Sequence, residues 1–240
     1  GYAGGSGSDV VTLVGGATFG ALLGADGTDT LILGGMADSA LDIGQTVGFE
    51  SRTLNGGAVW TLSGADSDAA DWTLDSGTLR LTGIQSINRG AGVLVNAGAT
   101  LSVGDTNAMG ALNGTGAVTI DSGQILIAGF NDADSVFSGV ISGAGSLSQS
   151  GAGVMTLSGT NTFTGDARVD AGTLRLGASN VIADTARLFV YSGATLDIQG
   201  FNETVGLVSL EGTLNGTGTL SAADYYLYGA TANANLGAGS

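Results

Sequence analysis

The 240-residue chain has 21 acidic and 6 basic residues, which gives a formal charge of −15, and 43% of its residues are hydrophobic. This charge repels nucleic acid phosphates and anionic lipid surfaces, so we expect no nucleic acid partner. All six cations are arginine, and lysine, histidine, cysteine and proline are absent. The 45 glycines follow no three-residue period, which excludes collagen and favours a stack of tight turns.

Two related segments lie near the N-terminus. Residues 4–9 precede the run VVTLVGG and residues 24–29 precede TLILGG, at an offset of 20 residues that suits one coil of a solenoid. Each segment resembles a single nonapeptide of the calcium-binding β-roll, G-G-x-G-x-D-x-U-x. We expect Asp9 and Asp29 to cap turns by side-chain-to-backbone hydrogen bonds, and the alternative is that their oxygens bind Ca²⁺.

The chain also contains an internal duplication. Residues 55–104 align without a gap to residues 150–199 at an offset of 95, with about 40% identity, as expected of a repeat architecture. Within each copy, strand centres recur after 22 residues, from Leu79 to Leu101 and from Leu174 to Leu196. These steps predict a three-strand coil of about 20–24 residues.

Further copies carry Asn-Gly pairs, which are turn signals. Asn113-Gly114 and Asn215-Gly216 are 102 residues apart, seven more than the main offset. The difference predicts a longer loop between Gly200 and Gly212.

Candidate chemistry is limited to carboxylates, because triads, thiolates and lysine bases all need residue types that the chain lacks. The best acidic cluster is Asp66, Asp68 and Asp71 beside Trp72, a ring able to stack on a sugar. In the second copy Asp71 recurs as Asp166, whereas Asp66, Asp68 and Trp72 are replaced by Asn161, Phe163 and Ala167, which favours a solvated turn over a glycosidase or lyase site. We therefore expect no enzymatic activity.

Structural roles are predicted for two other groups of residues. Tyr225, Tyr226 and Tyr228 are expected to cap a neighbouring coil, and the alternative is that they bind a sugar or a partner surface. Arg80 and Arg175 occupy equivalent places in the repeat, so we expect outward-facing side chains paired with carboxylates on adjacent coils.

The stretch from Ser138 to Gly177 is the best-preserved part of the pattern. Its apolar runs are only a few residues long and are separated by Gly, Ser, Asn or Asp, which is typical of strands. Its sequence, SGAGSLSQSGAGVMTLSGTNTFTG followed by VDAGTLRLG, closely resembles the passenger-associated repeat of bacterial autotransporters.

The resemblance implies an all-β, right-handed parallel β-helix that occupies residues 1–240 as one continuous piece of a longer passenger. It further implies type V secretion in a Gram-negative bacterium, an extracellular or cell-surface location, and a role as an adhesive or virulence-associated stalk. The expected partners are a host-cell or extracellular-matrix surface, or other passengers through self-association. Contact with a membrane is expected only through a C-terminal translocator barrel outside this chain, and no cofactor is expected apart from the Ca²⁺ alternative.

Overall fold

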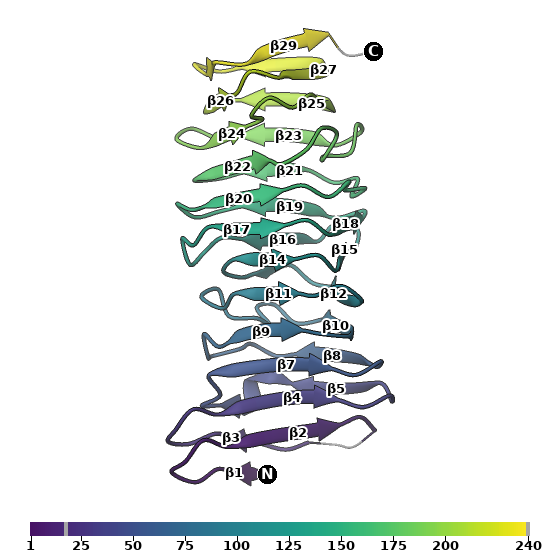
Figure 1. The fold of residues 1–240 in the computed structure, drawn as a ribbon, viewed down its shortest axis with the longest axis vertical. Coiled ribbons are helices and arrows are strands. Elements are labelled where there is room, and N and C mark those ends of the chain that lie inside the picture. Colours follow the sequence, from purple (N-terminus) through teal and green to yellow (C-terminus); the bar gives the residue numbers. More distant parts are fainter. Residues whose placement is uncertain (17–18, 239–240) are drawn as a thin grey trace.

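In the computed structural model, which describes residues 1–16 and 19–238, the chain forms a rod of stacked coils with its termini at opposite ends (Figure 1). Its strands pair in parallel across successive coils. The longest sheet has 12 strands in chain order, one from each coil. The rod is therefore a β-solenoid of about twelve coils, and the predicted parallel β-helix is confirmed.

The 12-stranded sheet is called face 1. Its strands are β2 (Val10–Val14), β4 (Thr30–Gly34), β7 (Ser51–Asn55), β9 (Asp71–Leu74), β11 (Val93–Val95), β14 (Leu112–Gly114), β17 (Ser135–Phe137), β20 (Val154–Leu157), β22 (Thr173–Leu176), β24 (Thr195–Asp197), β26 (Thr213–Asn215) and β28 (Thr231–Ala232).

A six-stranded sheet, face 2, follows face 1 in the six consecutive coils that begin with β4 and end with β17. Its strands are β5 (Ser39–Asp42), β8 (Val59–Ser63), β10 (Gly77–Leu81), β12 (Ala99–Val103), β15 (Ala117–Ile120) and β18 (Val140–Gly143). A single 3₁₀ turn, η1 (Ile43–Gln45), follows β5.

Face 3, the remaining side of the rod, comprises two sheets. A three-stranded sheet supplies β1 (Tyr2–Ala3), β3 (Leu22–Leu23) and β6 (Thr46–Val47). An eight-stranded sheet supplies β13 (Asn107–Ala108), β16 (Ile125–Ala128), β19 (Ser146–Gln149), β21 (Ala167–Val169), β23 (Arg187–Val190), β25 (Glu203–Leu210), β27 (Thr219–Leu227) and β29 (Asn235–Ala238).

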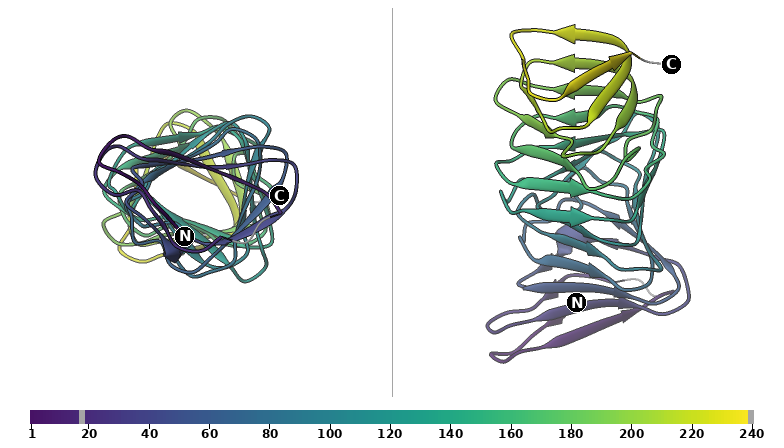
Figure 2. Two further views of the ribbon diagram at one scale, coloured as in Figure 1. Left: turned by 90° about the horizontal axis from the view of Figure 1, so that it is seen from below. Right: turned by 45° about the horizontal axis from the view of Figure 1, so that its top comes forward.

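The coils wind in the right-handed sense. Face 1 lies toward the viewer in Figure 1, and the arrows of β4, β7 and β9 point right as the chain rises from the N-terminus. Viewed along the axis, the coils superimpose into a closed ring (Figure 2).

Apolar side chains stacked in register fill the interior of the ring. Leu33, Leu54, Leu74 and Val95 occupy successive positions on face 1, and all four have no exposed surface. Burial of such a side chain contributes about 1.5–3 kcal/mol. Because strand side chains alternate between the two sides of a sheet, the intervening residues face solvent.

Coil lengths agree with the sequence-based steps in part. The pairs Leu79–Leu101 and Leu174–Leu196 are direct neighbours on consecutive coils, so the 22-residue step is one coil. Paired residues on face 1 are separated by as few as 18 residues, from Thr195 to Thr213. The predicted range of 20–24 was therefore too narrow at its lower end.

The two copies of the duplicated block sit on different sides of the rod. Strands β8, β10 and β12 lie on face 2, whereas their equivalents at an offset of 95, β20, β22 and β24, lie on face 1. The offset of 95 residues thus contains four whole coils and two sides of a fifth coil. It falls one side short of five coils, so the second copy is shifted from face 2 to face 1.

This geometry also corrects the predicted loop between Gly200 and Gly212, because strand β25 occupies most of that interval. The Asn-Gly copies, 102 residues apart, both lie on face 1, in β14 and at the end of β26. The extra seven residues are therefore one side of a coil, which returns the pattern to the same face.

Beyond β18, face 2 has no strand in the described part of the chain, and buried polar side chains replace part of its hydrogen-bond ladder. Asn161 accepts a hydrogen bond from Ile141 N at 2.8 Å and donates one to Val181 O at 2.9 Å. Glu203, which is 1% exposed, accepts from Val181 N at 2.8 Å and Ile182 N at 3.1 Å. Burial raises the pKa of Glu203 to about 7, outweighing the backbone N–H groups that lower it.

Candidate functional site

The acidic cluster found in the sequence forms a buried ion network. Arg52 points inward from β7, and its guanidinium lies 3.0 Å from Asp66 Oδ2 and 3.1 Å from Asp68 Oδ2. The Arg52 and Asp66 side chains are fully buried, while the Asp68 side chain is 20% exposed. The Arg52 Cζ atom lies 5.7 Å from the centre of the Trp72 ring. Asp66, Asp68 and Trp72 thus gather around the Arg52 guanidinium.

The network forms where face 3 lacks a strand between β6 and β13. Asp68 Oδ2 accepts a hydrogen bond from Gly48 N at 2.9 Å, and Asp66 Oδ1 accepts one from Asp68 N at 3.1 Å. These side chains satisfy backbone groups that a strand ladder would otherwise pair. Burial raises the pKa of Asp66, although the Arg52 charge lowers it.

The location corrects two expectations. Trp72 is 0% exposed and Asp66 is 6% exposed, so neither forms a surface platform for a sugar. Asp66 also does not lie in a solvated turn. The signal in the sequence was Arg52 itself, which occupies an inward position in the alternating run Ser51-Arg52-Thr53-Leu54.

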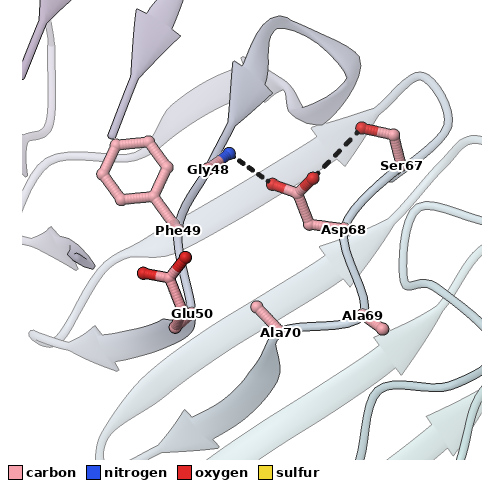
Figure 3. A pocket seen from close by; sticks show the side chains of 7 residues that line it. All are labelled: Gly48, Phe49, Glu50, Ser67, Asp68, Ala69 and Ala70. Atoms are coloured by element: carbon pink, nitrogen blue, oxygen red, sulfur yellow. Dashed lines mark hydrogen bonds between the residues drawn. The ribbon is translucent and has the colours of Figure 1, made fainter. Parts of the chain in front are cut away.

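A hollow of about 450 Å³ opens beside this network, between the segment Gly48–Glu50 and the segment Ser67–Ala70 (Figure 3). Its two carboxylates already have partners. Glu50 Oε2 accepts a hydrogen bond from Asp29 N at 2.6 Å, and Asp68 binds Gly48 and Arg52. Asp66, whose pKa is raised, does not line the hollow. Glycoside hydrolysis needs an accessible acid and an accessible carboxylate facing one substrate, and this hollow does not supply that pair.

The N-terminal carboxylates form a ladder across three coils. Asp9 Oδ2 accepts a hydrogen bond from Gly5 N at 2.8 Å, and Asp29 Oδ1 accepts one from Asp9 N at 2.7 Å. Glu50 continues the ladder through its bond from Asp29 N. Asp9 and Asp29 therefore cap backbone groups as expected. Asp29 Oδ2 is buried without a hydrogen-bond partner, and within residues 1–16 and 19–238 no three Asp or Glu side chains lie close enough to hold a metal ion together.

The three C-terminal tyrosines separate into two roles. The Tyr225 hydroxyl lies 2.6 Å from both Leu220 O and Gly237 O, and burial raises the pKa of this hydroxyl. Tyr225 packs against the core, in agreement with the capping expectation. Tyr226 is 47% exposed and Tyr228 is 60% exposed, so these two rings lie on the surface.

Face 3 carries other outward-facing aromatic rings, which were not predicted from the sequence. Phe189 and Tyr191 of the β23 segment stack at 6.4 Å between ring centres. Arg187 lies over Phe189 at 5.6 Å and Arg168 lies over Tyr191 at 5.1 Å. Alternation in the run Arg187-Leu-Phe-Val-Tyr191 was the available signal.

These rings align with the C-terminal tyrosines along the rod. Phe189 pairs with Ser209 on the next coil, and Ser209 pairs with Tyr226 on the coil after that. Phe189, Tyr191, Tyr226 and Tyr228 are together called the aromatic row. Tyrosine and arginine are enriched in protein interfaces, which makes the aromatic row the candidate contact surface.

Together, the uninterrupted parallel coils, the glycine-rich corners and the repeated strand pattern define a parallel β-solenoid. Residues 147–176, from β19 to β22, match the passenger-associated-transport-repeat family. The chain is also 32% identical over 171 residues to the adhesin BmaC autotransporter of Brucella suis biovar 1 (strain 1330). These findings confirm the resemblance seen in the sequence.

The aligned region covers 70% of this chain and 4% of that much longer adhesin. No solved structure matches the chain significantly. In the described part of the chain, no helix is long and apolar enough to cross a membrane.

Proposed function

We propose that the chain is a stalk segment of an adhesive autotransporter passenger, displayed at or released from the surface of a Gram-negative cell. The observation that carries the proposal is the 171-residue similarity to an autotransporter adhesin. The passenger repeat at residues 147–176 supports the same secretion route.

The architecture suits a chain that folds after export. Each coil gains its strand pairing and core contacts as soon as it docks on the preceding coil, because contacts in a solenoid are made between neighbours. The chain has no cysteine, so no disulfide loop obstructs passage of an unfolded chain. We infer a structural and adhesive role without catalysis, since the carboxylates of the Figure 3 hollow are committed to internal partners.

The proposed partners are a host-cell or extracellular-matrix surface, or a second passenger. The aromatic row supports contact on face 3, because Tyr226 and Tyr228 are both exposed beside one another on β27 and its C-terminal end. Exposed tyrosine rings supply contact area with little loss of conformational entropy.

The test uses beads coated with the purified chain. We expect them to adhere to cultured epithelial cells or matrix-coated surfaces, or to clump, more than albumin-coated beads do. Failure in all three assays contradicts the adhesive role.

The contact surface is tested with a double variant. Replacing Tyr226→Ser together with Tyr228→Ser is expected to reduce adhesion at least twofold. The matched control is Tyr2→Ser, which removes a ring that is 40% exposed at the other end of the rod. An equal loss in both variants contradicts the assignment to the aromatic row.

A further inference from the structure

A second surface feature lies on face 1, away from the aromatic row. A groove of about 380 Å³ crosses β9, β11, β14 and the turn before β17. Four consecutive coils each contribute one residue at the same register position along the groove, and these residues are Asp71, Gly92, Ala111 and Asp134. The two small residues form the floor, and the two carboxylates stand at its ends.

The carboxylates are held in fixed orientations. Asp71 Oδ1 accepts a hydrogen bond from Gly92 N at 2.7 Å, and Asp134 Oδ1 accepts one from Val154 N at 2.8 Å. Both side chains are exposed, and their Oδ2 atoms accept no hydrogen bond from any residue that the structure describes. Each Asp thus presents a preorganised anionic oxygen to solvent. Three coil steps separate them, a distance of about 14 Å at 4.7–4.9 Å per step.

The space between the carboxylates is bordered by apolar and amide groups. Leu94, 38% exposed, lies along one wall, and Asn113 and Asn131 line the same groove. Asn113 Oδ1 accepts a hydrogen bond from Val136 N at 2.9 Å, which fixes the amide. A ligand here meets an apolar strip with an anionic group at each end.

Among residues 1–16 and 19–238, none of those lining the groove is basic. Arg89, the closest cation along the chain, lies over the Phe130 ring at 5.0 Å, and the whole chain carries a formal charge of −15. We propose that this groove binds an extended peptide segment of a partner protein that carries two basic side chains. The inference rests on the proposed adhesive function and names the chemistry of one partner.

The spacing fits such a segment. An extended peptide rises about 3.3 Å per residue and places alternate side chains on the same side, so residues i and i+4 are about 13 Å apart on one side. Lysine or arginine at these positions reaches Asp71 and Asp134, while the residues between them cover Gly92, Ala111 and Leu94. Charge complementarity also favours this occupant over an acidic peptide.

The experiment measures binding of a fluorescent peptide that has two lysines four residues apart in a serine and threonine background, by anisotropy with the full chain. The double variant Asp71→Asn with Asp134→Asn keeps the oxygen that each backbone N–H needs. It is expected to weaken binding at least fivefold. The charge-matched control is Asp26→Asn with Asp224→Asn, two exposed carboxylates outside the groove, and it is expected to weaken binding less than twofold.

Three outcomes overturn the inference. These are absence of binding, an equal loss in both double variants, and groove-dependent binding of a neutral oligosaccharide in place of the peptide. The bead assay separates this inference from the proposed function: adhesion that survives the groove variants leaves the stalk role intact, whereas peptide binding without bead adhesion supports the groove alone.

Discussion

Replacing Arg52 with leucine is expected to destabilise the N-terminal coils by about 2 kcal/mol at neutral pH. Removing one partner of a buried ion pair costs about 3–5 kcal/mol, and burial of the leucine side chain recovers about half of that loss. The Arg52 and Asp66 side chains are both fully buried, so the substitution leaves the Asp66 carboxylate without its cation. Asp68 retains 20% exposure and keeps some access to water.

Two further terms set the size and pH dependence of the effect. The new leucine at an inward position recovers part of the loss through apolar burial, about 1.5–3 kcal/mol when burial is complete. Burial already raises the pKa of Asp66 in the native protein, and removing Arg52 raises it further. Because the folded variant then favours the protonated acid, its stability rises as the pH falls, and the deficit is smaller near pH 4.5 than at pH 7.5.

The assay is urea unfolding followed by tryptophan fluorescence and far-UV circular dichroism. Both tryptophans, Trp60 and Trp72, lie in the N-terminal half, so fluorescence reports the affected coils while circular dichroism reports the whole rod. The matched control is Arg175→Leu, which breaks a partly exposed pair with Asp197 at the rod surface and is expected to cost about 0–1 kcal/mol. If Arg52→Leu shifts the fluorescence transition no more than Arg175→Leu at pH 7.5, the buried network does not stabilise the fold as argued.

The remaining predictions concern other positions. The pKa of Glu203 in the folded protein is about 7, above its ordinary value of 4.5. The stabilisation from this group is therefore fully present below about pH 4.5, and the free energy of unfolding falls by about 3 kcal/mol as the pH rises through 7. Glu203→Gln should flatten this part of the stability–pH profile, and an unchanged profile contradicts the assignment. Gly24→Ala should lower the thermal midpoint, because a Cβ atom there meets the carbonyl oxygen of Gly48 on the next coil, whereas Gly5→Ala, which has open space around it, should leave the midpoint unchanged. If Asp9 and Asp29 only cap turns, neither Ca²⁺ nor a chelator should shift the melting temperature, and a Ca²⁺-dependent rise would instead establish the ion-binding alternative.

Much of the fold was predictable because the strand pattern is local. The alternation of apolar and polar residues and the 22-residue steps from Leu79 to Leu101 and from Leu174 to Leu196 are sequence properties, and the structure pairs these residues directly. The side of the rod on which each strand lies was harder to predict from the sequence. Sequence identity shows that two segments are equivalent, but which side of the rod each one occupies depends on the summed lengths of all the coils between them.

The candidate sites were harder to predict for a different reason. From the sequence, Asp66 and Trp72 were expected at the surface because an acidic segment of small residues is normally a solvated turn. The burial of Asp66 follows from Arg52, 14 residues earlier, which enters the core from β7. Trp72 is buried because it occupies an inward position of β9. The groove on face 1 joins four residues that are spread from position 71 to position 134. Such a set is recognisable only when the register of four coils is known.

The rotation between the duplicated copies has a consequence for how the rod meets its surroundings. Arg80 on face 2 and its counterpart Arg175 on face 1 both pair with a carboxylate on a later coil, Asp121 and Asp197 respectively. They nevertheless project from different sides of the rod. A partner that approaches along one azimuth therefore meets a feature from only one copy, so duplication of the block broadens the directions that the rod addresses without raising its valency toward any single surface.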